Sequence, residues 1–221
     1  MIRACIFDLD GTLADTLESM AFVANKILQE FGLRTLPTDN FRYYSGEGAR
    51  MLMKRCLKDA GDTELLHWED GERRYREIFA EDPMYRVVPY EGMTETLKVL
   101  RENGVRTAVC SNKPHPAAVK VIEILFPGMF DMVLGQSSEI PRKPAPDGVL
   151  KIAETFGVEP QECMYVGDTY TDMRTGKAAG AFTVGALWGF RDREELQDGG
   201  ADRIAEKPLD LLKLYEESKH D

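Results

Sequence analysis

Acidic residues follow a short apolar run near the start of the chain, and their spacing could support metal or acid–base chemistry. Asp8 and Asp10 come directly after the run ACIF and stand two residues apart, so an extended backbone points both carboxylates the same way. Carboxylates this close repel one another unless a cation lies between them or one is protonated. The pair predicts a site for a hard metal ion or a division of acid and base roles. The alternative is a solvated strand end where aspartate caps a turn.

A second acidic pair follows another apolar run, CMYVG. Asp168 and Asp172 are four residues apart, and both can face one point if a helix starts at Thr169. The sequence therefore places acidic pairs after two predicted strands.

Polar residues follow two further segments. Ser111 and Asn112 come directly after VRTAVC, and Lys143 stands in the proline-rich loop RKPAP. Taken singly, each has an ordinary explanation as a turn former or a solvated lysine. Ligands of open parallel sheets gather at the carboxyl ends of the strands, where all these residues fall. Together they offer carboxylates for a divalent cation, and an ammonium and donors for an anion, which indicates a metal and phosphate site.

The apolar runs alternate with helical patterns, which is typical of a parallel sheet with crossover helices. Continuous apolar runs fit strands that are buried on both faces. We therefore predict an α/β fold with a Rossmann-like parallel sheet flanked by helices. The predicted strands lie at residues 4–7, 105–110, 130–135, 163–167 and 181–188.

The pattern changes between Asp15 and Val88, where the periodicity is helical throughout. A first helix starts near Leu17 and ends at Gly32, and Asp15 and Glu18 match a capping box at its start. Two more helices are predicted, over residues 48–58 and from 62 to about 80. We therefore expect an inserted small helical domain at 15–87 and a discontinuous core domain at 1–14 and 88–221.

Composition limits the possible partners and location. The 221 residues carry 28 Lys and Arg against 38 Asp and Glu, a net charge of −10, which argues against broad binding to nucleic acid or anionic membranes. No run approaches the ~18 apolar residues of a membrane span. The four cysteines stand far apart without a C-x-x-C pair and are expected to be reduced thiols. We expect a cytoplasmic protein, and the sequence does not distinguish a monomer from a homodimer.

The polar segments resemble the four ordered motifs of the haloacid dehalogenase superfamily of phosphohydrolases. The matching strings are DLDGT at 8–12, Ser111-Asn112, Lys143-Pro144 and GDTYTD at 167–172. Within that superfamily the chain is most similar to the phosphoglycolate phosphatase group. The further similarities are the helical insert after the first motif, the strings SNKP and RKPAP, ALWGF at 186–190, and the glycine-rich stretch at 45–57.

The resemblance implies a role for each acidic residue. Asp8 is expected to be the nucleophile that forms an aspartyl-phosphate, and Asp10 to protonate the leaving group and later activate water. Mg²⁺ is expected to be held by the Asp8 side chain, the Asp10 backbone carbonyl and Asp168. Asp172 is expected to position a metal-bound water or Lys143.

The resemblance also implies how the substrate is held. Ser111, Asn112 and Lys143 are expected to bind the phosphoryl oxygens. The helical insert is expected to be a mobile cap that closes over the site and selects the substrate. The first-turn amides of the helix after Gly48, together with Arg50, could bind a substrate carboxylate. The alternative is that the glycines only form a turn and that Arg50 is solvated.

The expected function is a Mg²⁺-dependent phosphomonoester hydrolase acting on a small phosphorylated metabolite, with 2-phosphoglycolate as the first candidate. A β-phosphoglucomutase-like phosphotransferase or an inorganic pyrophosphatase remains an alternative, because these enzymes share the same core and first chemical step. A more distant alternative is a non-catalytic relative that binds a phosphorylated ligand.

Overall fold

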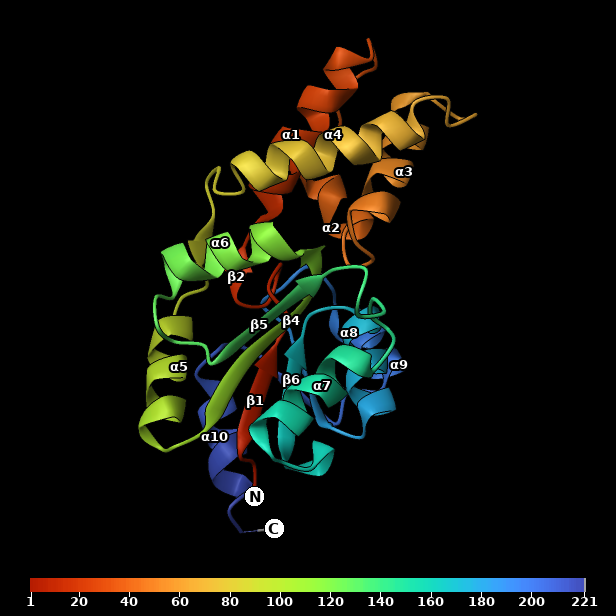
Figure 1. Ribbon diagram of the computed structural model, residues 1–221. Coiled ribbons are helices and arrows are strands. Elements are labelled where there is room, and N and C mark those ends of the chain that lie inside the picture. The colour runs from red at the N-terminus through yellow and green to blue at the C-terminus, as the bar shows by residue number, and fades with distance from the viewer. Residues whose placement is uncertain (221) are drawn as a thin grey trace.

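The computed structural model describes residues 1–220 and contains a six-stranded parallel sheet (Figure 1). The strand order is β5–β4–β1–β6–β7–β8, and every neighbouring pair is parallel. The α/β prediction is thus confirmed. The strands are β1 (Ala4–Phe7), β4 (Arg106–Pro114), β5 (Met132–Gln136), β6 (Cys163–Gly167), β7 (Phe182–Ala186) and β8 (Arg203–Ala205).

Helices cover both faces of the sheet because the central strands β1 and β6 are buried along their whole length. In β1, Cys5 and Phe7 pack on one side, while Ala4 and Ile6 pack on the other. The first side is covered by α5 (Met93–Glu102), α6 (His115–Leu125) and α10 (Asp210–Glu217). The second is covered by α7 (Asp147–Phe156), α8 (Tyr170–Ala179) and α9 (Arg193–Gly199) (Figure 1).

The segment between β1 and α5 forms a group of helices above the sheet, which we call the helical unit (Figure 1). It has its own apolar core. A short antiparallel pair of strands, β2 (Ala14–Asp15) and β3 (Val88–Pro89), holds together the segments that lead into and out of it. Its helices are α1 (Leu17–Glu30), the 3-10 turn Thr38–Asn40, α2 (Phe41–Tyr44), α3 (Ala49–Ala60) and α4 (Trp68–Glu81).

Two local predictions in the helical unit are wrong. The residue before α1 is Thr16; Asp15 accepts a hydrogen bond from the Leu17 amide, and Glu18 pairs with Arg86, so the predicted capping box does not form. The third predicted helix begins at Trp68 and not at Asp62, because the Asp62 carboxylate accepts hydrogen bonds from the backbone amides of residues 66 and 67 and closes a turn there.

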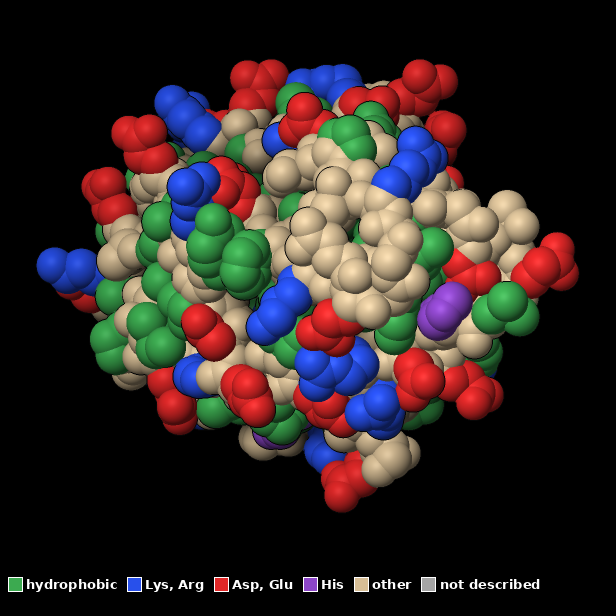
Figure 2. All heavy atoms as spheres, turned by 90° about the horizontal axis from the view of Figure 1, so that it is seen from above, with side chains coloured by type: hydrophobic (Ala, Val, Ile, Leu, Met, Phe, Trp, Pro, Cys, Tyr) green, Lys and Arg blue, Asp and Glu red, His purple; other side chains and the backbone are tan. Residues whose placement is uncertain are grey.

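The outer face of the helical unit carries Lys and Arg side chains interspersed with Asp and Glu (Figure 2). On α4, Arg73, Arg74 and Arg76 each pair with a glutamate of the same helix. A basic footprint for nucleic acid would instead cluster charges of one sign. Within residues 1–220, every helix is too short or too polar to cross a membrane.

Candidate active site

The predicted site residues converge at the carboxyl ends of the central strands. Asp8 directly follows β1, and Asp168 directly follows β6. Ser111 lies within β4, and Lys143 lies in the loop between β5 and α7. All four side chains are buried. The parallel topology therefore brings together residues from four separate segments, as the strand-end argument predicts.

Lys143 is the central cation of this cluster. Its Nζ lies 2.8 Å from Asp8 Oδ1 and 2.7 Å from Asp172 Oδ1, and it donates a hydrogen bond of 3.2 Å to the Tyr165 hydroxyl. Burial alone would lower the pKa of Lys143, but the Asp172 and Asp8 carboxylates raise it well above its ordinary value. The side chain therefore carries its positive charge in the folded protein.

Three buried carboxylates share this one ammonium group. Oxygens of Asp8, Asp168 and Asp172 all lie within 4.8 Å of one another. Burial raises the pKa of Asp8 to about 6, with Lys143 opposing this shift and Asp172 adding to it. Burial and the charges of Asp172 and Asp8 also raise the pKa of Asp168 well above its ordinary value. The cluster thus has an excess of negative charge that a further cation would balance.

A metal ion in this cluster would bind carboxylate oxygens whose bonding capacity is not used up within the protein. Asp8 Oδ1 is buried, and its contact of 2.8 Å with the Lys143 ammonium is its one polar contact among the described residues. Carboxylate oxygens are the ligands that Mg²⁺ and Ca²⁺ prefer. The residues present therefore fit a hard divalent cation between Asp8 and Asp168.

Asp168 is fixed by groups from two other parts of the chain. Thr12 Oγ1 donates to its Oδ1 at 3.1 Å, and the Phe190 amide donates to its Oδ2 at 2.8 Å. Two glycines make room for it: a Cβ at Gly11 would lie 2.2 Å from Asp168 Oδ2, and a Cβ at Gly189 would lie 2.3 Å from Asp168 Cβ. Any side chain at either glycine would displace the carboxylate.

We expect Gly189→Ala to destabilise the fold by about 1–3 kcal/mol and to weaken divalent-cation binding, because the added methyl group overlaps Asp168 and the Gly11 carbonyl. Thermal unfolding and calorimetric Mg²⁺ titration measure the two effects. Gly71→Ala is the matched control, since its Cβ would meet only side-chain atoms, the nearest at 3.3 Å. Equal changes in Tm and in Mg²⁺ affinity for the two variants would contradict the tight packing of Gly189 against Asp168.

Asp172 contacts Lys143 and lies in the first turn of α8. Thr169 precedes the helix, and its backbone amide and hydroxyl both donate to Asp172 Oδ2, at 3.1 and 2.6 Å. Tyr165 donates to Asp172 Oδ1 at 3.0 Å, beside the contact with Lys143. Each Asp172 oxygen therefore has two partners, whereas Asp8 Oδ1 contacts only the Lys143 ammonium among the described residues.

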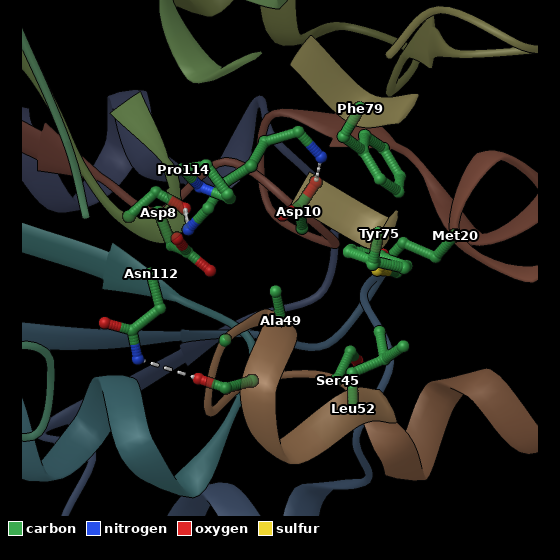
Figure 3. A pocket seen from close by; sticks show the side chains of 14 residues that line it. Asp8, Asp10, Met20, Ser45, Ala49, Leu52, Tyr75, Phe79, Asn112 and Pro114 are labelled. Carbon is green, nitrogen blue, oxygen red and sulfur yellow. Dashed lines mark hydrogen bonds and ion pairs between the residues drawn. The ribbon is translucent and has the colours of Figure 1, made fainter. Parts of the chain in front are cut away.

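Asn112 connects the Lys143 loop to the helical unit. Its Oδ1 accepts from the Lys143 amide at 2.9 Å, and its Nδ2 donates to the Lys143 carbonyl at 3.2 Å. The Nδ2 also donates to the Gly46 carbonyl at 3.0 Å (Figure 3). The neighbouring Ser111 lines the same cavity as Asp8. Both residues thus lie beside the acidic cluster, where the sequence places them.

A cavity of about 40 Å³ lies between the core and the helical unit. The core supplies polar groups such as Asp8, Asp10 and Ser111, whereas the helical unit supplies mainly apolar side chains (Figure 3). The contributors from the helical unit are Met20, Ser45, Gly46, Gly48, Ala49, Leu52, Tyr75 and Phe79. A ligand there would contact both parts of the chain at once.

Arg50 is not among the residues that line this cavity. Its guanidinium lies over the Trp68 ring, 4.3 Å from the centroid, and its Nε lies 4.0 Å from Glu72 on an exposed surface. The segment before α3 reaches the cavity through Ser45, Gly46 and Gly48. The structure therefore brings the glycine-rich turn to the site and leaves Arg50 outside it.

Lys113 was not among the predicted site residues. Its Nζ lies 2.8 Å from Asp10 Oδ1 and 4.6 Å from the centroid of the Phe79 ring, and its side chain is only 4% exposed. A charged residue directly after Ser111 and Asn112, in line with a buried strand, is the sequence signal that could have revealed it. Thr12 and Tyr165, which bond to the acidic cluster, were likewise missed.

The chain is similar to known proteins over nearly its whole length. The family model for haloacid dehalogenase-like hydrolases matches residues 2–180. The chain belongs to this family. The phosphoglycolate phosphatase of Aquifex aeolicus (strain VF5) is 36% identical to this haloacid dehalogenase-like hydrolase over 216 residues, 97% of each chain. That of Escherichia coli (strain K12) is 31% identical over 232 residues, covering 96% of this chain and 91% of the relative.

Solved structures agree with the family assignment. A crystal structure described as a predicted phosphoglycolate phosphatase from Haemophilus somnus 129PT superposes with a TM-score of 0.89. It is 25% identical in sequence, and the match covers 97% of this chain and 98% of that one. This haloacid dehalogenase-like hydrolase therefore shares the full arrangement of core and helices with that protein.

Proposed function

We propose that this enzyme is a Mg²⁺-dependent phosphomonoester hydrolase that works through an aspartyl-phosphate at Asp8 and acts on 2-phosphoglycolate or a similarly small ester. The observation that carries the proposal is the meeting of Asp8, which lines the cavity, with Lys143 and Asp168. Whole-chain similarity to relatives named phosphoglycolate phosphatase supports the substrate class.

In the first step, an Asp8 carboxylate oxygen attacks phosphorus and the bond to the leaving oxygen breaks, while Asp10 gives that oxygen a proton. In the second step, Asp10 takes a proton from water, the water oxygen attacks phosphorus, and Asp8 is released with inorganic phosphate. Lys143, Ser111 and Asn112 hold the phosphoryl oxygens throughout. Asp172 keeps the Lys143 ammonium beside Asp8 through its own contact of 2.7 Å.

The Asp8 and Asp168 carboxylates and the Asp10 backbone carbonyl would hold the Mg²⁺ ion. When bound, the ion supplies positive charge that balances the acidic cluster and the phosphoryl oxygens. Thr12 and the Phe190 amide keep Asp168 directed toward this position, because each binds one of its oxygens.

Mg²⁺ binding should weaken as pH falls through about 6. A raised carboxyl pKa means that the folded, metal-free protein binds more protons than the unfolded chain, so protonation of Asp8 and Asp168 stabilises it and competes with the metal. We expect the rise in Tm caused by Mg²⁺ to be larger at about pH 7.5 than at about pH 5. Asp168→Asn should abolish the rise, whereas an equal shift at both pH values would argue against this site.

We further propose that residues 15–87 form a cap domain over a core of residues 1–14 and 88–221. The separate apolar core of the helical unit and the paired strands β2 and β3 at its base support this division. The cavity between the two parts supports a role in selecting the substrate and excluding water.

The proposal is tested by measuring phosphate release with Mg²⁺ from 2-phosphoglycolate, inorganic pyrophosphate and β-glucose 1-phosphate. We expect the highest kcat/KM for 2-phosphoglycolate. Isomerisation of β-glucose 1-phosphate in the presence of a trace bisphosphate would favour a phosphotransferase, and a preference for pyrophosphate would favour a pyrophosphatase. No release from any ester would instead favour a non-catalytic phospho-ligand-binding protein.

A further inference from the structure

Lys113 is a buried lysine at the site to which the proposed mechanism gives no role. It lies in β4, and its ammonium is placed between the Asp10 carboxylate and the Phe79 ring of the helical unit. Removing an ammonium ion from water is costly unless nearby groups compensate for the lost hydration. The contact of 2.8 Å with Asp10 supplies part of this compensation. An ammonium has three donors, so this contact leaves capacity for a further acceptor.

The two buried lysines of the site face different parts of a bound ester. Lys143 contacts the Asp8 and Asp172 carboxylates, next to the place where the phosphoryl group reacts. Lys113 contacts the carboxylate of Asp10, the residue that would protonate the leaving oxygen. Lys113 is therefore adjacent to the leaving group and not to the phosphoryl group.

The surroundings of Lys113 favour a small anion. Among the described residues that line the cavity, Lys113 is the only positively charged one. Met20, Leu52 and Phe79 line the same cavity and carry no charge, whereas Lys143 and Arg142 line a neighbouring cavity. The cavity volume of about 40 Å³ favours a small group over a bulky one.

We propose that Lys113 determines specificity by binding a carboxylate on the leaving group, so that the enzyme prefers phosphate esters of short hydroxy acids. This inference rests on the proposed function and names the residue that would recognise the second negative charge. The ammonium donates one hydrogen bond to Asp10 and another to the substrate carboxylate. The same contact places the leaving oxygen beside Asp10. An ester of a neutral alcohol lacks the contact and is held only by its phosphoryl group.

The test compares 2-phosphoglycolate with 2-hydroxyethyl phosphate, which replaces the carboxylate by a neutral group of similar length. The readout is the ratio of the two kcat/KM values, because any disturbance of Asp10 affects both esters and cancels. We expect Lys113→Met to lower this ratio by roughly 10- to 100-fold, the usual range for loss of a hydrogen bond to a charged group. Most of the loss should appear in KM for 2-phosphoglycolate.

Lys113→Arg keeps the charge and should retain part of the preference, and Lys151→Met, an exposed lysine of α7, is the matched control that should keep all of it. An unchanged ratio in a folded Lys113→Met variant would overturn the inference, as would a wild-type ratio near one. Hydrolysis of p-nitrophenyl phosphate separates the two proposals. If the enzyme hydrolyses p-nitrophenyl phosphate but does not prefer 2-phosphoglycolate to 2-hydroxyethyl phosphate, only the role of Lys113 is overturned. If it hydrolyses none of the three esters, the proposed function is overturned.

Discussion

Asp8→Asn is expected to reduce kcat for 2-phosphoglycolate by at least roughly ten thousandfold while the protein stays folded. The amide has nearly the shape of the carboxylate but cannot act as a nucleophile toward phosphorus. Stability should not suffer, because burial disfavours the charged form of Asp8 and raises its pKa to about 6. Lys143 also keeps its contact with Asp172. We therefore expect a Tm equal to or higher than that of the wild type.

Steady-state kinetics and thermal unfolding separate the two halves of this prediction. Asp198→Asn makes the same chemical change at an exposed position of α9 and should leave both quantities as they are. Substantial turnover by folded Asp8→Asn would show that another residue is the nucleophile.

Lys143→Met is expected to have the largest effect on stability, a loss of about 3–5 kcal/mol near neutral pH. The substitution leaves Asp8 and Asp172 buried side by side without the ammonium that now lies 2.8 and 2.7 Å from them. Activity should also fall by roughly a thousandfold or more, because the phosphoryl oxygens lose a buried cation. Denaturant unfolding and kinetics measure the two losses.

The stability loss should depend on pH in a definite direction. The repulsion exists only while the carboxylates are ionised, and loss of Lys143 raises the pKa of Asp8 above its wild-type value of about 6, so the difference in unfolding free energy between variant and wild type should narrow as pH falls from alkaline values toward about 6. Lys98→Met, at a lysine whose side chain is 70% exposed, is the control and should change stability little. A gap that stays constant with pH would refute the electrostatic explanation.

The sequence is sufficient to place Asp8, Asp168 and Ser111 near one another, because each is recognised from the few residues that directly precede it. Each follows or ends a short apolar run, and the ends of parallel strands meet at one edge of a sheet. Thr169 is also a local signal, because it caps the N-terminus of α8 and so brings Asp172 close to Asp8 and Asp168. The α/β fold follows from the same alternation of runs and helical patterns.

Contacts between distant segments could not be predicted in this way. The pairing of Lys113 with Asp10, and of the Phe190 amide with Asp168, depends on strand order and loop packing. Arg50 was assigned to the site from its place in a helix, but its direction depends on Trp68 of the adjacent helix α4. Strand β8 was missed because Arg203–Ala205 is too short to form an apolar run.

The central claim is that Asp8 carries the phosphoryl group during turnover, and acid quenching tests it most directly. The enzyme is mixed with 2-phosphoglycolate and Mg²⁺, quenched in acid within one turnover, and reduced at once with borohydride, which converts the acyl phosphate to a stable alcohol and releases phosphate. Trypsin then releases residues 4–26 as one peptide, and mass spectrometry locates the reduced residue. The account predicts reduction of Asp8 and not of Asp10. Turnover with no reduction of Asp8, or with reduction of another residue, would contradict it.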